Sequence, residues 1–210
     1  MEASSISAAT AGWTDRLPTL PGERVHLRWL ETADVPALFS IFSNPRVMRY
    51  WSSPPLPDVA AAGALLAEIH ASFATRSLYQ WGIERNGESG VIGTCTLFRL
   101  DAVHGRAEIG YALASAEWGR RLASDALDVL IRFAFETLGL HRLEGDVDPR
   151  NERSIALLLK KGFRREGVLR ERYRVNGEIH DTVMLGLLRR EWPPAGQSAT
   201  AASVSCSSCS

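Results

Sequence analysis

The feature that most constrains this chain is the stretch from Ser115 to Leu138, where a short basic turn leads into a strongly periodic helix. Apolar residues recur there at the spacing of one helical face, namely Ala126, Leu127, Leu130, Ile131 and Ala134. Charged residues take the opposite face, namely Asp125, Asp128, Arg132 and Glu136. Gly139 follows where a helix C-cap is expected. The pattern predicts a helix that packs one face against a core.

The turn before this helix has the chemistry of an anion site. A helix start leaves unpaired backbone N–H groups and a partial positive charge, so it can hold an anion. Gly119 lets the backbone come close to a ligand, and Arg120 and Arg121 add full positive charges. We interpret the turn as a site for a phosphate-bearing ligand. The alternative is an ordinary surface helix whose first turn is basic.

The composition is that of a soluble globular protein. Hydrophobic residues make up 45% and charged residues 23% of the 210 residues, which suits one domain with a core plus tails. Basic and acidic residues balance at 24 each, so we expect no nucleic-acid partner, which would need a basic surface. No apolar run could cross a membrane and no secretory signal is evident. We therefore expect a cytoplasmic protein with no membrane partner.

Cysteine usage agrees with a reducing compartment. Cys95 lies in an apolar, strand-like run, whereas Cys206 and Cys209 lie in a Ser/Ala-rich tail. Three cysteines in these settings do not form a disulfide framework. Cys206 and Cys209 match only half of a zinc site, so we expect no metal.

Periodicity and turn signals divide the chain into three parts. Residues 1–20 read as a flexible arm, 21–192 as one folded domain, and 193–210 as a disordered tail. Within the domain, strand patterns fall at 25–29, 78–84, 91–100, 106–113, 141–147, 163–174 and 178–188. Helix patterns fall at 35–42, 58–73, 115–138 and 151–161.

Two local features bear on a binding cleft. Residues 46–57 are rich in prolines and aromatics, so we expect a loop in which Tyr50 and Trp51 contact substrate or simply cover the edge of the core. Gly110 lies inside the strand at 106–113, where a lone glycine predicts a bulge or a close backbone approach.

The strands at 106–113 and 141–147 are joined by the long helix, which predicts a parallel crossover in an otherwise antiparallel sheet. Where such neighbours diverge, a slot opens that a ligand can enter. Backbone groups freed in the slot can pair with an extended amide chain, and the basic turn at the same end can hold a diphosphate. Together these have the outline of coenzyme A.

Four segments also resemble a known family. They are A-E-I-G-Y-A-L, W-G-R-R-L-A-S-D-A-L, D-P-R-N-E-R-S-I-A-L-L-L-K-K-G-F and G-V-L-R-E-R-Y-R-V-N-G-E-I-H-D-T-V-M-L-G-L-L. They are similar to those of GCN5-related N-acetyltransferases (GNAT), and most similar to the branch that acetylates N-terminal amines of ribosomal proteins. The resemblance covers about 24–192 and is more specific in the second half.

The resemblance implies a single α/β (α+β) domain. Its sheet is mixed, mostly antiparallel and seven-stranded, splayed between the fourth and fifth strands and flanked by about four helices. It implies acetyl-CoA as the donor and a primary amine as the acceptor. A protein N-terminus is the favoured acceptor and a small-molecule amine the alternative, and a homodimer stays open.

The resemblance also assigns cofactor contacts. They fall on the turn residues Trp118, Gly119, Arg120, Arg121, Leu122, Ala123 and Ser124, on Tyr111, Ala112 and Leu113 of the strand, and on Asn151 and Ser154. The family usually has glycine where this chain has Arg121, and we expect arginine to fit only if the backbone angles there are ordinary. This departure keeps open a non-catalytic acyl-CoA-binding or sensor domain.

Direct attack of an amine on a thioester requires a base and a group that stabilises the leaving thiolate. Glu108, in the strand beside the slot, is our candidate base if burial raises its pKa. The alternative is a carboxylate paired with a neighbouring arginine. The resemblance places Ser154 beside the leaving thiolate; the alternative is that Asn151 and Ser154 merely cap a helix.

Overall fold

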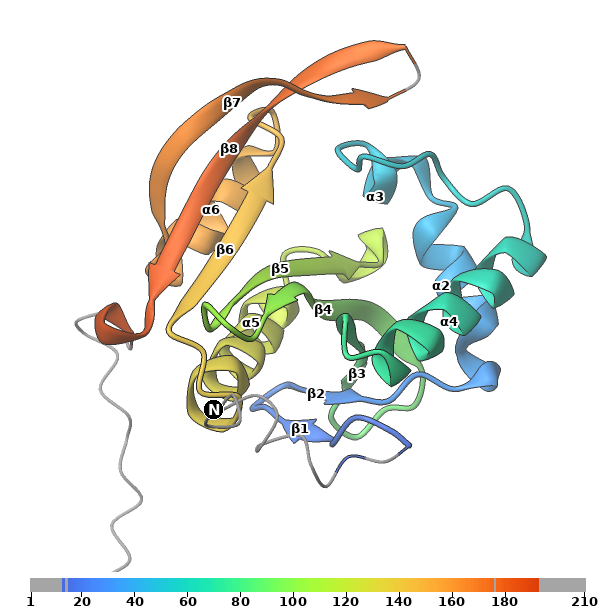
Figure 1. Cartoon of the computed structure of the whole chain (residues 1–210). Coiled ribbons are helices and arrows are strands. Elements are labelled where there is room, and N and C mark those ends of the chain that lie inside the picture. Colours follow the sequence, from blue (N-terminus) through green and yellow to red (C-terminus); the bar gives the residue numbers. More distant parts are fainter. Residues whose placement is uncertain (1–12, 14, 176, 193–210) are drawn as a thin grey trace, which may run out of the picture.

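The computed structural model of the chain describes residues 13, 15–175 and 177–192 (Figure 1). Most of the expected N-terminal arm, the tail at 193–210 and both of its cysteines lie outside the described residues. None of the described helices is long and apolar enough to span a membrane.

One mixed sheet of eight strands organises the fold, in the order β1-β2-β3-β4-β5-β6-β8-β7. The strands are β1 Leu20–Pro21, β2 Val25–Arg28, β3 Leu78–Arg85, β4 Val91–Asp101, β5 Arg106–Leu113, β6 Arg142–Val147, β7 Arg164–Val175 and β8 Glu178–Leu188. β5 and β6 are parallel, and the other neighbouring pairs are antiparallel. The strand beyond the predicted seven is β1, which is too short to leave a sequence pattern.

Within the described residues, five α-helices surround the sheet, one more than predicted. They are α2 Val35–Phe42, α3 Pro45–Met48, α4 Val59–Ala74, α5 Leu122–Arg132 and α6 Glu152–Lys160. Short helical turns are η1 Thr32–Asp34, η2 Ser115–Glu117, the π-helical η3 Phe133–Thr137 and η4 Arg189–Glu191. In Figure 1, α2 and α4 lie beside the right half of the sheet, α5 lies behind the centre, and α6 lies behind β6 and β8.

The helix α3 corrects the prediction that residues 46–57 form only a loop. Pro45 occupies the first turn of α3, where its missing N–H costs nothing and its fixed φ suits a helix. Asn44 caps the helix by accepting a hydrogen bond from the backbone N–H of Arg46 at 2.9 Å.

The predicted apolar face of α5 and η3 is confirmed. All five of its residues have no exposed surface, and they belong to the core between α5 and the sheet. Part of the charged face is also used. Asp125 accepts backbone N–H groups of Arg24 and Val25 at 2.8 and 3.0 Å, which ties β2 to α5. Asp128 pairs with the buried Lys161 at 2.5 Å.

The prediction of a bulge at Gly110 is wrong, and the bulge lies in the neighbouring strand. Pairing of β5 with β4 is regular past Gly110, whereas β4 shifts register between Phe98 and Asp101. One extra residue is accommodated there, and Arg99 takes a left-handed φ of 49°. A Cβ on Gly110 would lie 3.4 Å from the Phe98 ring, which is an ordinary contact distance, so the packing there does not demand glycine.

Candidate active site

The strands β5 and β6 pair only over a short closed end and then diverge. Three pairs form the parallel ladder, namely Arg106↔Arg142, Ala107↔Leu143 and Glu108↔Glu144. β5 nevertheless continues to Leu113 and β6 to Val147. Figure 1 shows β6, β8 and β7 turning away from β5 beyond this point. The predicted splay between the two parallel strands is therefore confirmed.

The free edge of β5 carries backbone groups of alternate residues. The backbone N–H of Ala114 donates to the Ile92 carbonyl of β4 at 2.8 Å. Because backbone groups alternate along a strand, those of Ala112 also face β4, whereas those of Tyr111 and Leu113 face the gap. The Leu113 carbonyl accepts the indole N–H of Trp118 at 2.8 Å. Of the three predicted strand contacts, Tyr111 and Leu113 thus have free-edge geometry and Ala112 does not.

The turn before α5 has left-handed backbone at two positions. Gly119 has a φ of 79° and Arg121 a φ of 63°. The expectation that Arg121 requires ordinary angles is therefore wrong: arginine adopts the conformation that usually selects glycine, at a cost of about 1–2 kcal/mol. Arg121 is the N-cap of α5, and its side chain is exposed.

The residues from Trp118 to Ser124 differ in how far they are buried. Gly119, Arg120 and Arg121 are exposed, and Arg120 lies 3.6 Å from Glu117. Leu122 is buried in the core, so only its backbone can face a ligand. The rest of the predicted turn set, Trp118, Ala123 and Ser124, is half-buried. The N-terminus of α5 therefore offers backbone N–H groups between two exposed arginines and the core.

A pair of hydroxyl groups joins β5 to the start of α6. The Tyr111 hydroxyl lies 2.7 Å from the Ser154 Oγ. Burial raises the pKa of Tyr111 to about 12, so its hydroxyl keeps its proton at neutral pH. Asn151 caps α6 by accepting a hydrogen bond from the Ser154 backbone N–H at 3.2 Å. The capping alternative thus holds for Asn151, while the Ser154 hydroxyl faces Tyr111.

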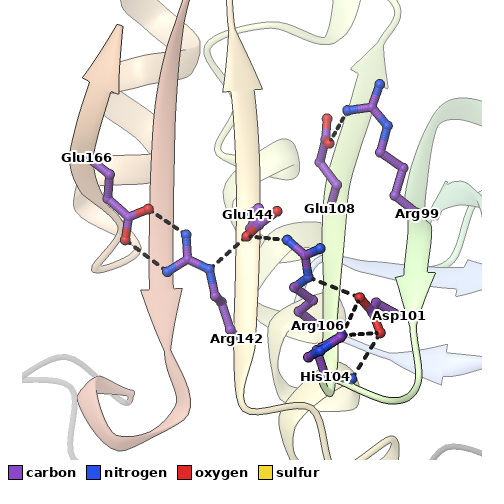
Figure 2. Close-up of polar contacts among 8 residues, drawn as sticks. All are labelled: Arg99, Asp101, His104, Arg106, Glu108, Arg142, Glu144 and Glu166. Atoms are coloured by element: carbon purple, nitrogen blue, oxygen red, sulfur yellow. Dashed lines mark hydrogen bonds and ion pairs between the residues drawn. The ribbon is translucent and has the colours of Figure 1, made fainter. Parts of the chain in front are cut away.

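Glu108 lies at the last ladder pair, where the strands begin to diverge. Its carboxylate is 5% exposed and accepts a hydrogen bond from Arg99 Nη1 at 2.7 Å, as Figure 2 shows. Burial raises the pKa of Glu108, the Arg99 charge opposes that rise, and the nearby Asp146 and Glu144 add to it. Glu108 is therefore a buried carboxylate of raised pKa and also pairs with an arginine. Its role as a base stays a prediction.

An ionic network joins Glu144 to the first ladder pair, Arg106 and Arg142 (Figure 2). Glu144 accepts from Arg142 at 2.8 Å and lies 3.4 Å from Arg106. Arg142 reaches across β8 to Glu166 with both terminal nitrogens, and Arg106 continues the network to Asp101 at 3.3 Å. Every charge in this network has a partner, so it serves to hold the strands together.

Three polar residues near Glu108 were missed from the sequence. Asp146 follows Glu144 on the same face of β6, with its side chain 5% exposed, and accepts hydrogen bonds from Tyr173 Oη at 2.6 Å and from Thr182 Oγ1. Arg99 lies beside both Glu108 and Tyr173. Alternation of charged and apolar residues in R-L-E-G-D-V marks Asp146, but nothing local marks Arg99 or Tyr173.

The two predicted substrate contacts separate in the structure. Trp51 packs edge-to-face on Phe42, with ring centroids 5.5 Å apart, and borders the core around α2 and α4. Its role as a cover for the core is the one the structure favours. Tyr50 lies 5.2 Å from Arg49 and 5.8 Å from Arg150, measured from guanidinium carbon to ring centroid. Tyr50 therefore bridges the α3 segment and the turn between β6 and α6.

Comparisons with known proteins point to one family. A family model described as an acetyltransferase (GNAT) domain matches residues 24–164. The uncharacterized N-acetyltransferase p20 of Bacillus licheniformis is 36% identical over 176 residues, which cover 84% of this chain and 99% of p20.

More distant relatives carry more specific names. The spermidine N(1)-acetyltransferase of Escherichia coli K12 is 28% identical over 80% of this chain and 88% of its own. The ribosomal protein uS5-alanine N-acetyltransferase of the same strain is 28% identical over 62% of this chain and 68% of its own. A solved structure, Mycobacterium smegmatis RimJ in complex with CoA-disulfide, is 26% identical with a TM-score of 0.74, covering 87% of this chain and 91% of RimJ.

Proposed function

Since the chain belongs to the GNAT family of acetyltransferases, we propose that it moves an acetyl group from acetyl-CoA directly to a primary amine, and that this amine is a protein N-terminus. The observation that carries the proposal is the divergence of β5 and β6 immediately beyond Glu108. It leaves a buried carboxylate at the apex of a gap whose sides carry a hydroxyl pair and a free strand edge. These are the groups that acyl transfer to an amine requires.

The residues around the gap fit coenzyme A. Backbone groups of Tyr111 and Leu113 on the free edge of β5 can pair with an extended amide chain. The N-terminus of α5, with Arg120 and Arg121, suits a diphosphate. When bound, acetyl-CoA supplies the thioester whose carbonyl carbon the amine attacks. The M. smegmatis RimJ structure, which is described as a complex with CoA-disulfide, supports this assignment.

Glu108 accepts the first proton. An ammonium group that reaches its carboxylate transfers a proton to oxygen, which leaves a neutral amine and a neutral carboxylic acid. Because burial raises the pKa of Glu108, this transfer is less uphill than it would be to an exposed glutamate. The C–N bond then forms and the C–S bond breaks. The nitrogen loses its second proton in this step, and the leaving thiolate gains one proton and departs as a thiol.

Ser154 stabilises the leaving group with the help of Tyr111. The Tyr111 hydroxyl stays protonated, so it can donate to Ser154 Oγ across their 2.7 Å contact. The Ser154 proton is then free to be donated to a developing thiolate. The resemblance assigned Tyr111 only a strand contact, so its hydroxyl is an addition to the proposed site.

Three arginines beside Trp118 and Tyr50 favour a peptide over a polyamine as the acceptor. Arg46 stacks over Trp118, with 5.5 Å between the guanidinium carbon and the ring centroid, and Arg49 and Arg150 approach Tyr50. Among the residues described, neither Arg46 nor Arg49 forms an ion pair, while Arg150 pairs with Asp148 at 2.6 Å. Like charges repel a polycation such as spermidine. A peptide carries a single ammonium group at its N-terminus, and the uS5-alanine relative supports this acceptor.

Release of free thiol from acetyl-CoA tests the proposal. We expect turnover with peptides that begin with a free N-terminal amine, less turnover with spermidine, and none with the same peptides already acetylated. Turnover with spermidine and not with any peptide would overturn the choice of acceptor. Coenzyme A binding without thiol release on any amine would favour the sensor domain that Arg121 keeps open.

A further inference from the structure

Among the charge pairs around the ladder, Arg99 and Glu108 are the pair whose two members differ most in exposure. The Glu108 side chain is 6% exposed, whereas the Arg99 side chain is 54% exposed. Contact is made by a single nitrogen, Nη1, at 2.7 Å. A buried anion is thus paired with a cation whose side chain is more than half exposed.

The backbone of β4 is distorted at the residue that supplies this cation. The register shift between Phe98 and Asp101 places Arg99 outside the regular ladder with a φ of 49°. A non-glycine residue in this region costs roughly 1–3 kcal/mol and persists where the surroundings impose it. The distortion carries the guanidinium over the gap, beside Tyr173 on the opposite hairpin.

The groups that face Glu108 come from three strands. Arg99 approaches from β4, Glu144 and Asp146 from β6, and Tyr173 of β7 lies against Arg99 and Asp146. Arg172 pairs with Asp146 at 3.6 Å, and Arg106 and Arg142 pair with Glu144, so among the described residues Arg99 is the cation that pairs with Glu108 itself. If it turned away and nothing replaced it, a buried carboxylate would remain beside two others, which is unfavourable. A cation at this position therefore favours the ionised form of Glu108.

We propose that Arg99 stands in for the acceptor, occupying the place on Glu108 that the substrate ammonium group takes when it enters and displaces the guanidinium. This inference rests on the proposed function and identifies the acceptor as a species that arrives protonated. Arg99 is then a positioning residue, because it keeps Glu108 ionised and ready until the ammonium replaces it. Once Glu108 has taken the proton and become neutral, nothing draws Arg99 back into the path of the reaction.

Removal of the guanidinium tests this inference without any need for turnover. Arg99→Gly and Arg99→Asn suit a positive φ, so both variants should fold. We expect each to raise the pKa of Glu108 by about 1, because an opposite charge at contact distance is lost. The measurement is a carboxyl-carbon NMR titration in which Glu108 is identified by its absence in Glu108→Gln.

A small ammonium ion should then refill the position. Methylammonium chloride, compared with sodium chloride at the same ionic strength, should lower the pKa of Glu108 again in Arg99→Gly. Arg106→Gln is the matched control, since Arg106 is 46% exposed and its partners are Asp101 and Glu144. We expect no methylammonium effect in that variant, where Arg99 still fills the place.

Two results would overturn the inference. One is an unchanged Glu108 pKa in both Arg99 variants, and the other is a methylammonium effect no larger than that of sodium. If thiol release shows no acetylation of any amine, the titration still decides the role of Arg99. If amines are acetylated and the titration is flat, the role of Arg99 fails while the proposed function stands. In active protein, the acidic limb of kcat/KM should move to higher pH in Arg99→Gly.

Discussion

Glu108 and Glu144 are ladder partners on adjacent strands, yet their surroundings differ in a way that separates structure from chemistry. Both belong to the last ladder pair, but Glu144 lies within reach of two arginines that connect onward to Glu166 and Asp101. Glu108 lies where the strands part and is held by one exposed arginine (Figure 2).

The comparison shows that the number and exposure of the partners matter more than the residue type. A carboxylate held by several arginines is fixed in position, so it contributes to the sheet. A buried carboxylate with one removable partner has a perturbed pKa and can exchange that partner for a ligand. Two glutamates that look equivalent in the sequence can therefore have separate roles.

The largest expected effect is the loss of the base. Glu108→Gln should lower kcat/KM by about 10²–10⁴-fold, because general base catalysis supplies a factor of this size. Glu144→Gln is the matched change on the neighbouring strand and should stay within a few-fold of wild type. Thiol release by both variants measures the difference. Equal losses in the two variants would remove the distinction between these carboxylates.

Ser154→Ala should have the next largest effect. Loss of one hydrogen bond to a developing thiolate should reduce kcat roughly tenfold, since hydrogen bonds to charged groups are worth about 1.5–3 kcal/mol. Tyr111→Phe acts through the same contact, so combining the two changes should add little to the loss from Ser154→Ala alone. Fully multiplicative losses would show that the two hydroxyl groups act independently.

A smaller effect is expected at the start of α5, on the open side of the gap. Arg121→Gly should raise the free energy of unfolding by about 1 kcal/mol, because glycine relieves the left-handed backbone. It should also weaken coenzyme A binding through the lost charge. Urea denaturation and calorimetric titration measure these quantities, with Arg120→Gly as the control that loses charge but relieves no positive φ. Tighter coenzyme A binding in Arg121→Gly would show that arginine impairs the site.

The smallest effect is expected at Gly186 of β8, beside the ion pair between Arg142 and Glu166. A Cβ on Gly186 would overlap the Glu166 carboxylate and approach Arg142 Nη1 at 2.9 Å, so Gly186→Ala should open that ion pair. Because both groups are flexible and partly exposed, the cost should be about 0.5–1 kcal/mol in unfolding free energy, with kcat unchanged. A large loss of activity would show that the ion pair between Arg142 and Glu166 does more than hold the strands together.

Much of the fold could be predicted because its signals are local. The buried face of α5, the helix α4 expected at 58–73 and the parallel crossover all follow from spacing and turn chemistry over short stretches. The errors also have local causes. β1 has only two residues, which leave no pattern. Pro45 starts α3 instead of preventing a helix. The bulge lies in β4 and not in β5, where it was predicted.

In the site, sequence reasoning identified the residue types but not their partners. Periodicity and capping are properties of neighbouring residues, so the chain alone was enough to place Glu108 on a strand and Ser154 at the start of a helix. The pairing of Glu108 with Arg99, the Tyr111–Ser154 contact and the approach of Asp146 depend on where separate strands meet. Burial and charge distances arise only when distant segments pack together, and they set the pKa of a carboxylate.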